Sequence, residues 1–361
     1  MQPTQGVNPD TVFSDLYPVL YAAAEPIDGG SYFRMSEICA TIAAARSGLR
    51  GAHVLDIGSG YGTTTLAISS FAPKIITAVD SSSGMIELMR MLFFGDEDIT
   101  SWLRARGADI VLGDYFERTA AHLMRMRVWF RGGVFRRRGG ELDTVIGDGL
   151  VVDRLCRGSR ADVVIGNNYL HWPVNQQLAK FRERNFTGEE ALREACRDAL
   201  QPLARALKPG GIAVLMEPND FVTADDDAAE QADLLAASMV SHPVFIRFHE
   251  AVNAILKREY GIERAVPTVT DLFPTSRLAE LAASGGFRLV ETIHVEGTYP
   301  CDPLDAFFVR LPMLAGSLKI PFEAKLGLGR VVREELRQTL TEEERGMPVR
   351  SQWFFFVFEK Q

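Results

Sequence analysis

The sequence has few cysteines, no excess of basic residues and no long hydrophobic run, and each shortage excludes a class of protein. The four cysteines are far apart and include no CxxC pair, so we expect reduced thiols and not a disulfide framework or a cysteine-based metal site; they are Cys39, Cys156, Cys196 and Cys301. The formal net charge of −8 argues against a surface built mainly to hold a phosphate backbone, which usually needs a basic excess.

Membrane insertion and export are also not expected. No stretch reaches the roughly 18 consecutive apolar residues that a membrane span needs. The first residues, MQPTQGVNPDTVFSDLYP, have neither the basic start nor the apolar run of a targeting signal. We therefore expect a cytoplasmic protein without membrane partners.

The composition and the order of apolar runs indicate one α/β fold with insertions. Hydrophobic residues make up 47% of the 361 residues and charged residues 24%, which is enough apolar material for a full core. Short β-branched runs alternate with helical stretches, a pattern typical of a mostly parallel, doubly wound sheet with helices on both faces. Seven strands are predicted, at 53–57, 75–80, 142–147, 162–167, 211–217, 287–296 and 352–359.

The length exceeds that of a typical single domain, and helical additions to the core explain the excess. Residues 1–50 are predicted to form an N-terminal helical cap, and residues 51–361 the core, with insertions at about 95–141, 220–270 and 298–350. Tyr17 and Tyr21 lie beside the apolar face of the cap, and His249 lies in an amphipathic pattern of the second insertion. We expect these helices to form a lid over a compact substrate, with Tyr17, Tyr21 and His249 as candidate contacts. The alternative is that they only stabilise the core or a homodimer.

A glycine-rich turn follows the first predicted strand. The segment VLDIGSGYG at 54–62 places Asp56 near the end of the strand and glycines at 58, 60 and 62. Glycines allow a tight turn and a close approach of the main chain to a ligand. A dinucleotide fingerprint would need a glycine where this chain has Thr63. The segment instead resembles motif I of class I S-adenosylmethionine-dependent methyltransferases, which implies that Asp56, Gly58, Ser59 and Gly60 contact that cofactor.

Acidic residues at the ends of the next two strands extend this resemblance. Asp80 closes the second strand, where a carboxylate can accept both ribose hydroxyls, and the resemblance places Ser81 beside the adenosine. Two GD pairs compete for the third contact, with Asp114 and Asp148. Asp148 is preferred, because only that choice gives LDTVIGDG a place in the sheet. Asp148 and Gly149 are therefore expected at the adenine edge.

The fourth predicted strand ends in a polar and aromatic segment, ADVVIGNNYLHW at 161–172. Open α/β sheets bind ligands at the carboxyl ends of their strands. The LHW triplet resembles a signature of small-molecule methyltransferases, which implies that Asn167 and Asn168 border the cofactor and that His171 and Trp172 border the acceptor. His171 could take a proton from a phenol or an amine, or it could only hydrogen-bond the strand end or the cofactor.

The leading interpretation is a methyltransferase that uses S-adenosylmethionine to methylate oxygen or nitrogen of a small molecule, in the biosynthesis of a specialised metabolite. No metal is expected, because the chain has no recognisable carboxylate cluster of the metal-dependent catechol type. Alternatives are a non-methylating reaction with the same cofactor, such as a cyclisation or decarboxylation, and a binding module without activity.

RNA methylation is a further alternative, because one segment mixes basic and aromatic residues as RNA-binding surfaces do. We expect that segment to be a surface hairpin or an interface, and we do not expect nucleic acid as a partner. Its arginines are Arg125, Arg127, Arg131, Arg136, Arg137 and Arg138, and its aromatic residues are Trp129, Phe130 and Phe135.

Overall fold

The computed structural model describes residues 17–27, 30–155, 160–184, 186, 188–218, 222–223, 241–262, 273–299, 302–305 and 322–361. The strands are β1 (His53–Ile57), β2 (Ile75–Asp80), β3 (Glu141–Ile146), β4 (Ala161–Asn167), β5 (Leu207–Pro218), β6 (Val222–Thr223), β7 (Phe273–Pro274), β8 (Phe287–Tyr299) and β9 (Val349–Lys360).

Helices connect these strands. Before β4 they are α2 (Tyr17–Ile27), α3 (Ser31–Ser47), α4 (Thr63–Ser69), α5 (Ser83–Phe93), α6 (Ile99–Arg104), α7 (Ala108–Leu112), η1 (Gly113–Tyr115), α8 (Phe116–Gly132), α9 (Val134–Arg137), η2 (Gly149–Val151) and α10 (Val152–Leu155). After β4 they are α11 (His171–Glu183), α12 (Gly188–Ala206), α14 (Pro243–Tyr260), η5 (Thr275–Arg277), α15 (Leu278–Ser284), α17 (Phe322–Thr339) and α18 (Glu342–Gly346).

The main sheet has seven strands in the order β3-β2-β1-β4-β5-β9-β8. The first five strands run parallel, and β9 is antiparallel to both β5 and β8. This confirms the predicted seven-stranded, mostly parallel, doubly wound fold. β1 and β2 begin and end where predicted, whereas β8 and β9 extend several residues further because they pair with each other along nearly their whole lengths.

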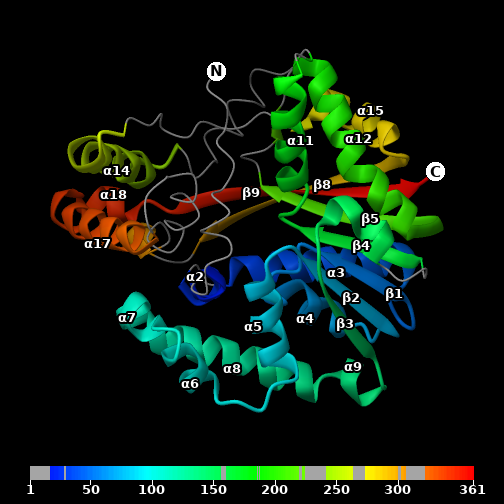
Figure 1. Cartoon of the computed structure of the whole chain (residues 1–361), viewed down its shortest axis with the longest axis horizontal. Helices are drawn as coiled ribbons and strands as arrows, with labels where there is room; N and C mark the ends of the chain where they lie inside the picture. The colour runs from blue at the N-terminus through cyan, green and yellow to red at the C-terminus, as the bar shows by residue number, and fades with distance from the viewer. Residues whose placement is uncertain are drawn as a thin grey trace.

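Two hydrophobic cores cover the two faces of the sheet. Side chains alternate along a strand, so Val54 of β1 joins one core with α3, α4, α5 and α8, while Leu55 joins the other with α11, α12 and α15. Figure 1 shows these two groups of helices on opposite sides of the sheet, with α14, α17 and α18 beyond the far ends of β8 and β9. Asp56 follows Leu55 and so faces the first core, toward α4.

The strand order reverses between β1 and β4, and this reversal positions the site. From β1 the chain passes through β2 to β3 on one side, and from β4 it passes to β5 on the other. In open α/β sheets, ligands bind outside the carboxyl ends of the strands at such a point. The glycine turn after β1 and the NNYLHW segment after β4 both begin there.

Most of the predicted helical additions fall on described residues. α2 and α3 occupy the predicted N-terminal cap, whose residues 1–16 lie outside the described part. The first insertion contains the helices from α6 to α9. In the second and third insertions the described helices are α14, α17 and α18, and residues 224–240 of the second insertion lie outside the described residues. Across the described ranges, no helix is long and apolar enough to cross a membrane.

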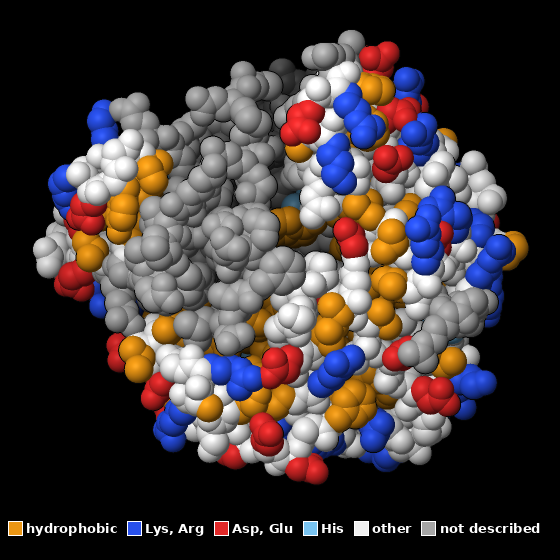
Figure 2. Space-filling model, viewed as in Figure 1, with side chains coloured by type: hydrophobic (Ala, Val, Ile, Leu, Met, Phe, Trp, Pro, Cys, Tyr) orange, Lys and Arg blue, Asp and Glu red, His pale blue; other side chains and the backbone are white. Residues whose placement is uncertain are grey.

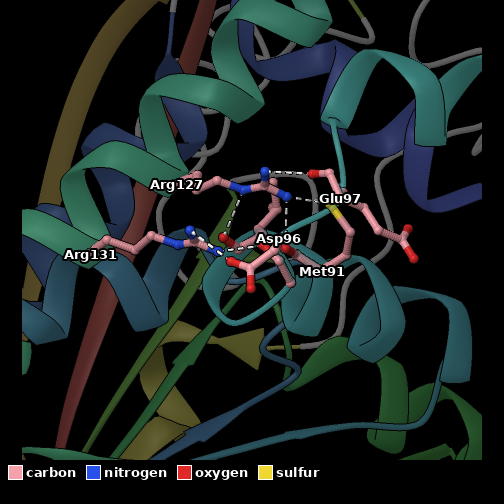
Figure 3. Close-up of polar contacts among 7 residues, drawn as sticks. Met91, Asp96, Glu97, Arg127 and Arg131 are labelled. Carbon is pink, nitrogen blue, oxygen red and sulfur yellow. Dashed lines mark hydrogen bonds and ion pairs between the residues drawn. The ribbon is translucent and has the colours of Figure 1, made fainter.

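The basic segment is helical, so the expectation of a surface hairpin was wrong, whereas the alternative of an interface segment stays a prediction. Arg127 and Arg131 of α8 reach across to the carboxyl end of α5 (Figure 3). Nη2 of Arg127 donates to the carbonyl of Met91 at 2.9 Å and Nη1 to that of Glu97 at 2.7 Å, while Arg131 lies 3.4 Å from the Asp96 carboxylate. Cations at a helix carboxyl end satisfy carbonyls that have no intrahelical partner, so both arginines have a structural role.

Apolar residues at helical spacing explain this difference. Leu123, Met126 and Phe130 are buried along one face of α8, a three-to-four-residue period typical of an amphipathic helix. Phe130 stacks on Phe93 with 4.1 Å between ring centroids. The arginines between these positions therefore lie at the edge of the face along which α8 packs, and not on a hairpin.

Candidate functional site

The turn after β1 depends on its glycines. Gly58, Gly60 and Gly62 have φ values of 63°, 55° and 104°, in the left-handed region where side chains with a Cβ are strained. The N–H of Gly62 donates to the carbonyl of Ser59 at 3.0 Å, and the N–H of Ser59 donates to Val79 of β2 at 3.1 Å. The turn is thereby fixed to the neighbouring strand.

Asp80 joins the glycine turn to the start of α5. Its Oδ2 accepts from the N–H of Gly60 and its Oδ1 from the N–H of Ser82, each at 2.8 Å. Burial raises the pKa of the Asp80 carboxyl, and the two backbone hydrogen bonds oppose that shift. Each carboxylate oxygen has a second lone pair, so both can also accept a hydroxyl of a ribose. The predicted neighbour Ser81 is exposed, whereas Ser82 caps α5.

Asp56 is fully buried beneath the turn. Thr65 of α4 donates to its Oδ2 at 2.6 Å, but its Oδ1 has no hydrogen-bond partner. Burial raises the pKa of this carboxyl to about 7, with the Thr65 hydrogen bond opposing the shift and the nearby Asp80 charge adding to it. A buried acceptor without a donor is costly, and a positively charged ligand group would satisfy it.

The raised pKa of Asp56 predicts a pH-dependent stability. An unfolded aspartate has a pKa near 3.9, so the folded state binds this proton more tightly. The stabilisation is then complete below the unfolded pKa and is lost as pH rises through about 7. Between pH 5 and pH 8, we expect wild type to lose about 2 kcal/mol more unfolding free energy than Asp56→Asn. Urea unfolding of both proteins at each pH measures this difference, and parallel pH profiles would contradict it.

Two asparagines at the end of β4 link the crevice to the N-terminal helices. Asn167 donates through Nδ2 to Ser36 Oγ of α3 at 2.7 Å, and Ser36 Oγ lies 2.9 Å from Thr64 Oγ1 of α4. Asn168, with a φ of 57°, donates to the hydroxyl of Tyr32. The side-chain carbonyl oxygens of both asparagines are buried without a partner. The nitrogen of each side-chain amide is thus hydrogen-bonded within the protein, whereas each oxygen remains able to accept a hydrogen bond.

Asp148 and Gly149 lie at the turn that follows β3. Because β3 pairs with β2 up to Asp80, this turn lies beside the end of β2. Asp148 caps η2 by accepting from the N–H of Leu150 at 2.9 Å. The competing Asp114 is exposed in η1, within the helical insertion. The structure thus supports the placement on which the choice of Asp148 depended.

His171 forms a buried pair with Glu217 of β5. Nδ1 of His171 lies 2.7 Å from Glu217 Oε2, and Glu217 Oε1 accepts from the N–H of Leu170 at 2.5 Å and from that of His171 at 3.3 Å. Glu217 is fully buried and His171 nearly so. A carboxylate that accepts from Nδ1 leaves Nε2 as the nitrogen able to take a proton. The ring of Trp172 lies 5.4 Å from that of His171, between centroids.

The tyrosines of α2 lie over the glycine turn. The ring of Tyr21 is 6.1 Å from Tyr17, 5.5 Å from Tyr32 and 6.3 Å from Tyr61, between centroids, and Tyr61 belongs to the turn itself. Burial raises the pKa of the Tyr17 hydroxyl, and the charge of Asp80 adds to the shift.

None of the described contacts of His249 is with the residues of the crevice. It is buried in α14, with its ring 4.3 Å from that of Phe245 and 5.7 Å from that of Phe248, between centroids. α14 packs against α17 and α18, which Figure 1 shows on the side of the molecule away from α11. This surrounding is that of a core histidine.

Sequence reasoning missed several residues of the site, and only some of them had a local signal. Ser82 could have been found, because a serine before a helical pattern is a typical N-cap. Glu217 lies at the end of a predicted strand, at the same edge of the sheet as His171, but its pairing with His171 leaves no sequence pattern. The others known only from the structure are Tyr32, Ser36, Thr64 and Tyr169.

Figure 2 shows that this face of the molecule is hollowed beside the end of α11 nearest the sheet.

The donor and acceptor groups of the crevice fit S-adenosylmethionine. Five buried polar atoms there have no partner: Asp56 Oδ1, Ser59 Oγ, Asn167 Oδ1, Asn168 Oδ1 and the Tyr169 hydroxyl oxygen. Three of them are acceptors only, as the α-ammonium of the methionine end requires. Asp80 suits the ribose diol. Among the described residues, no group of three or more His, Cys, Asp or Glu side chains could hold a metal ion.

Comparison with known proteins agrees with this fit. A family model described as a methyltransferase domain matches residues 32–292. No curated protein matches the chain. Three solved structures illustrate the fold-level similarity, all at low identity.

YjhP from E. coli is 15% identical, with 98% of this chain and 100% of that chain covered and a TM-score of 0.41. A putative methyltransferase from Bacillus halodurans is 15% identical, with 89% and 98% covered and a TM-score of 0.40. A putative sarcosine dimethylglycine methyltransferase from Galdieria sulphuraria is 16% identical, with 91% and 86% covered and a TM-score of 0.39. The family model spans more than half of the chain, from α3 to β8, and includes the whole glycine turn. The chain therefore belongs to the class I S-adenosylmethionine-dependent methyltransferases.

Proposed function

We propose that this protein transfers the methyl group of S-adenosylmethionine to an oxygen or nitrogen atom of a small molecule, in the biosynthesis of a specialised metabolite. The observation that carries the proposal is the buried pair of His171 and Glu217, placed directly after β4 at the edge where the unpartnered acceptors of the crevice lie. A phenol or an amine must lose a proton to become methylated, and a histidine fixed by a carboxylate can take it.

The cofactor supplies an electrophilic methyl group on its sulfonium, and the chain's own residues supply position and proton transfer. Asp80 and the glycine turn would hold the nucleoside, while Asp56, Asn167 and Asn168 would hold the methionine end. Glu217 keeps the proton of His171 on Nδ1, so that Nε2 can act as the base. Holding the reactants in contact accounts for a large part of such catalysis.

The helical additions support a compact acceptor. Tyr21 packs beside Tyr61 of the glycine turn, Tyr17 packs beside Tyr21, and Trp172 adjoins the base. We therefore assign α2, within the N-terminal cap of residues 1–50, the role of a lid over the acceptor. Two of the six arginines of the basic segment, Arg127 and Arg131, are engaged at the carboxyl end of α5 and directly after it, which weakens the support for the RNA alternative.

The test is to incubate the purified protein with S-adenosylmethionine and a panel of phenols, amines and carboxylic acids. We expect S-adenosylhomocysteine to accumulate with one class of acceptor, together with an equal amount of product carrying an added methyl group, both measured by mass spectrometry. A converted acceptor that lacks the methyl group, with the cofactor unconsumed, would contradict methyl transfer and favour the non-methylating reaction.

A further inference from the structure

Tyr169 fills the space between two glycines that belong to different strand ends. A Cβ atom on Gly149, after β3, would lie 1.8 Å from the Tyr169 hydroxyl, and one on Gly58, after β1, would lie 2.9 Å from its Cδ2. Real Cβ atoms do not come this close to a neighbouring atom, so the ring in this position requires glycine at both sites. The phenol therefore spans the distance from the glycine turn to the β3 turn.

The hydroxyl of Tyr169 is buried without a partner. The residue is 7% exposed, and its oxygen makes no hydrogen bond. Buried tyrosine hydroxyls usually find a partner, because an unsatisfied one costs roughly 1–3 kcal/mol. Burial raises the pKa of this hydroxyl, and the charges of Asp148 and then Asp80 add to the shift. The hydroxyl thus lies near the two carboxylates assigned to the nucleoside, and at neutral pH it carries a proton to donate.

The chain before Tyr169 fixes this placement. Asn168 adopts a left-handed backbone, which is uncommon outside glycine but tolerated by asparagine. Its N–H donates to the carbonyl of Met216 in β5 at 2.9 Å, and its side chain donates to Tyr32. Asn168 is therefore anchored through its main chain and its side chain, so the ring that follows it is preorganised.

We propose that Tyr169 is a cofactor-binding residue, with its ring forming a wall of the nucleoside subsite and its hydroxyl donating a hydrogen bond to an acceptor atom of the adenosine. This rests on the proposed function, because it assigns a ligand to the same crevice. The ring is held in place by its contacts with the two glycine turns. The hydroxyl, which has no hydrogen-bond partner in the protein, would find one in the adenosine.

Calorimetry with two ligands tests the proposal: S-adenosylhomocysteine, and 5′-methylthioadenosine, which keeps the adenosine but lacks the amino acid. We expect Tyr169→Phe to weaken the binding of both ligands by the same factor, about tenfold, because it removes one buried hydrogen bond and keeps the ring. Tyr260→Phe is the matched control, since Tyr260 is 43% exposed at the end of α14, and it should bind as wild type does. Thermal unfolding of each variant shows whether the fold is retained.

Three results would overturn the proposal. Unchanged or tighter binding by Tyr169→Phe would show that the hydroxyl makes no bond to the ligand, although the cofactor site would stand. A loss confined to S-adenosylhomocysteine would place the hydroxyl at the amino-acid end and not at the adenosine. Failure of the wild-type protein to bind either ligand would remove the proposed function and this proposal together.

Discussion

Replacement of His171 by glutamine is expected to lower kcat with a phenol or amine acceptor by a factor of about 10² to 10⁴, the usual contribution of a general base. Glutamine keeps hydrogen-bonding capacity beside Glu217 but cannot take a proton. The affinity for S-adenosylhomocysteine should stay at its wild-type value, because the crevice residues that would hold the cofactor are unchanged. Steady-state kinetics and calorimetry on the same preparation separate the two effects.

Two further variants make this test specific. His294→Gln is the control, because His294 is exposed on β8 and stacks on Phe354, and it should keep full activity. Glu217→Gln should lower kcat less than His171→Gln and alter its pH profile, since the base remains but its orientation and proton placement are no longer fixed. If His171→Gln retains wild-type kcat with every phenol and amine that the protein methylates, His171 is not the base.

Replacement of Asp80 by asparagine is expected to weaken S-adenosylhomocysteine binding at least about 100-fold. Hydrogen bonds to charged groups contribute about 1.5–3 kcal/mol each, and Asp80 would make two of them to the ribose. Asparagine also presents an NH₂ group to one of the two backbone N–H donors, from Gly60 or Ser82, that now bind the carboxylate. The turn then loses part of its anchor as well.

The control for Asp80 is Asp143→Asn. Asp143 lies on β3, opposite Thr77 of β2, and its side chain is exposed. Loss of its charge should therefore leave the affinity unchanged. Calorimetry gives the affinities, and thermal unfolding shows whether each variant is folded. Equal affinities of Asp80→Asn and wild type would mean that the ribose is held elsewhere.

Local patterns were sufficient to predict the sheet and the cofactor side of the crevice. β1 is a short apolar run followed by glycine, and β2 is one that ends at Asp80 and is followed by serine. Their extent and the polar groups beside their ends could therefore be predicted from neighbouring residues alone. The placement of Asp148 followed from the same logic, because a buried strand had to precede it. These features depend on periodicity and turn chemistry, which act over a few residues.

The remainder of the site depends on contacts between distant parts of the chain. Glu217 and His171 are 46 residues apart, and Asn167 and Ser36 are 131 residues apart. No periodicity records such a pair, because each member satisfies its own local pattern equally well without the other. Tyr169 was read only as part of an aromatic segment, since its relation to Gly58 and Gly149 exists only after three strands have come together.

The hydroxyl of Ser36 has a mechanical consequence. It lies within hydrogen-bond distance of Thr64 at the start of α4 and of Asn167 at the end of β4, so any shift of α3 on binding of an acceptor would be felt on both sides of the crevice. Occupancy of one ligand would then change the dissociation of the other, and thermodynamic linkage requires the effect on affinity to be equal in both directions. Such coupling would make the binding of cofactor and acceptor cooperative without fixing which of the two binds first.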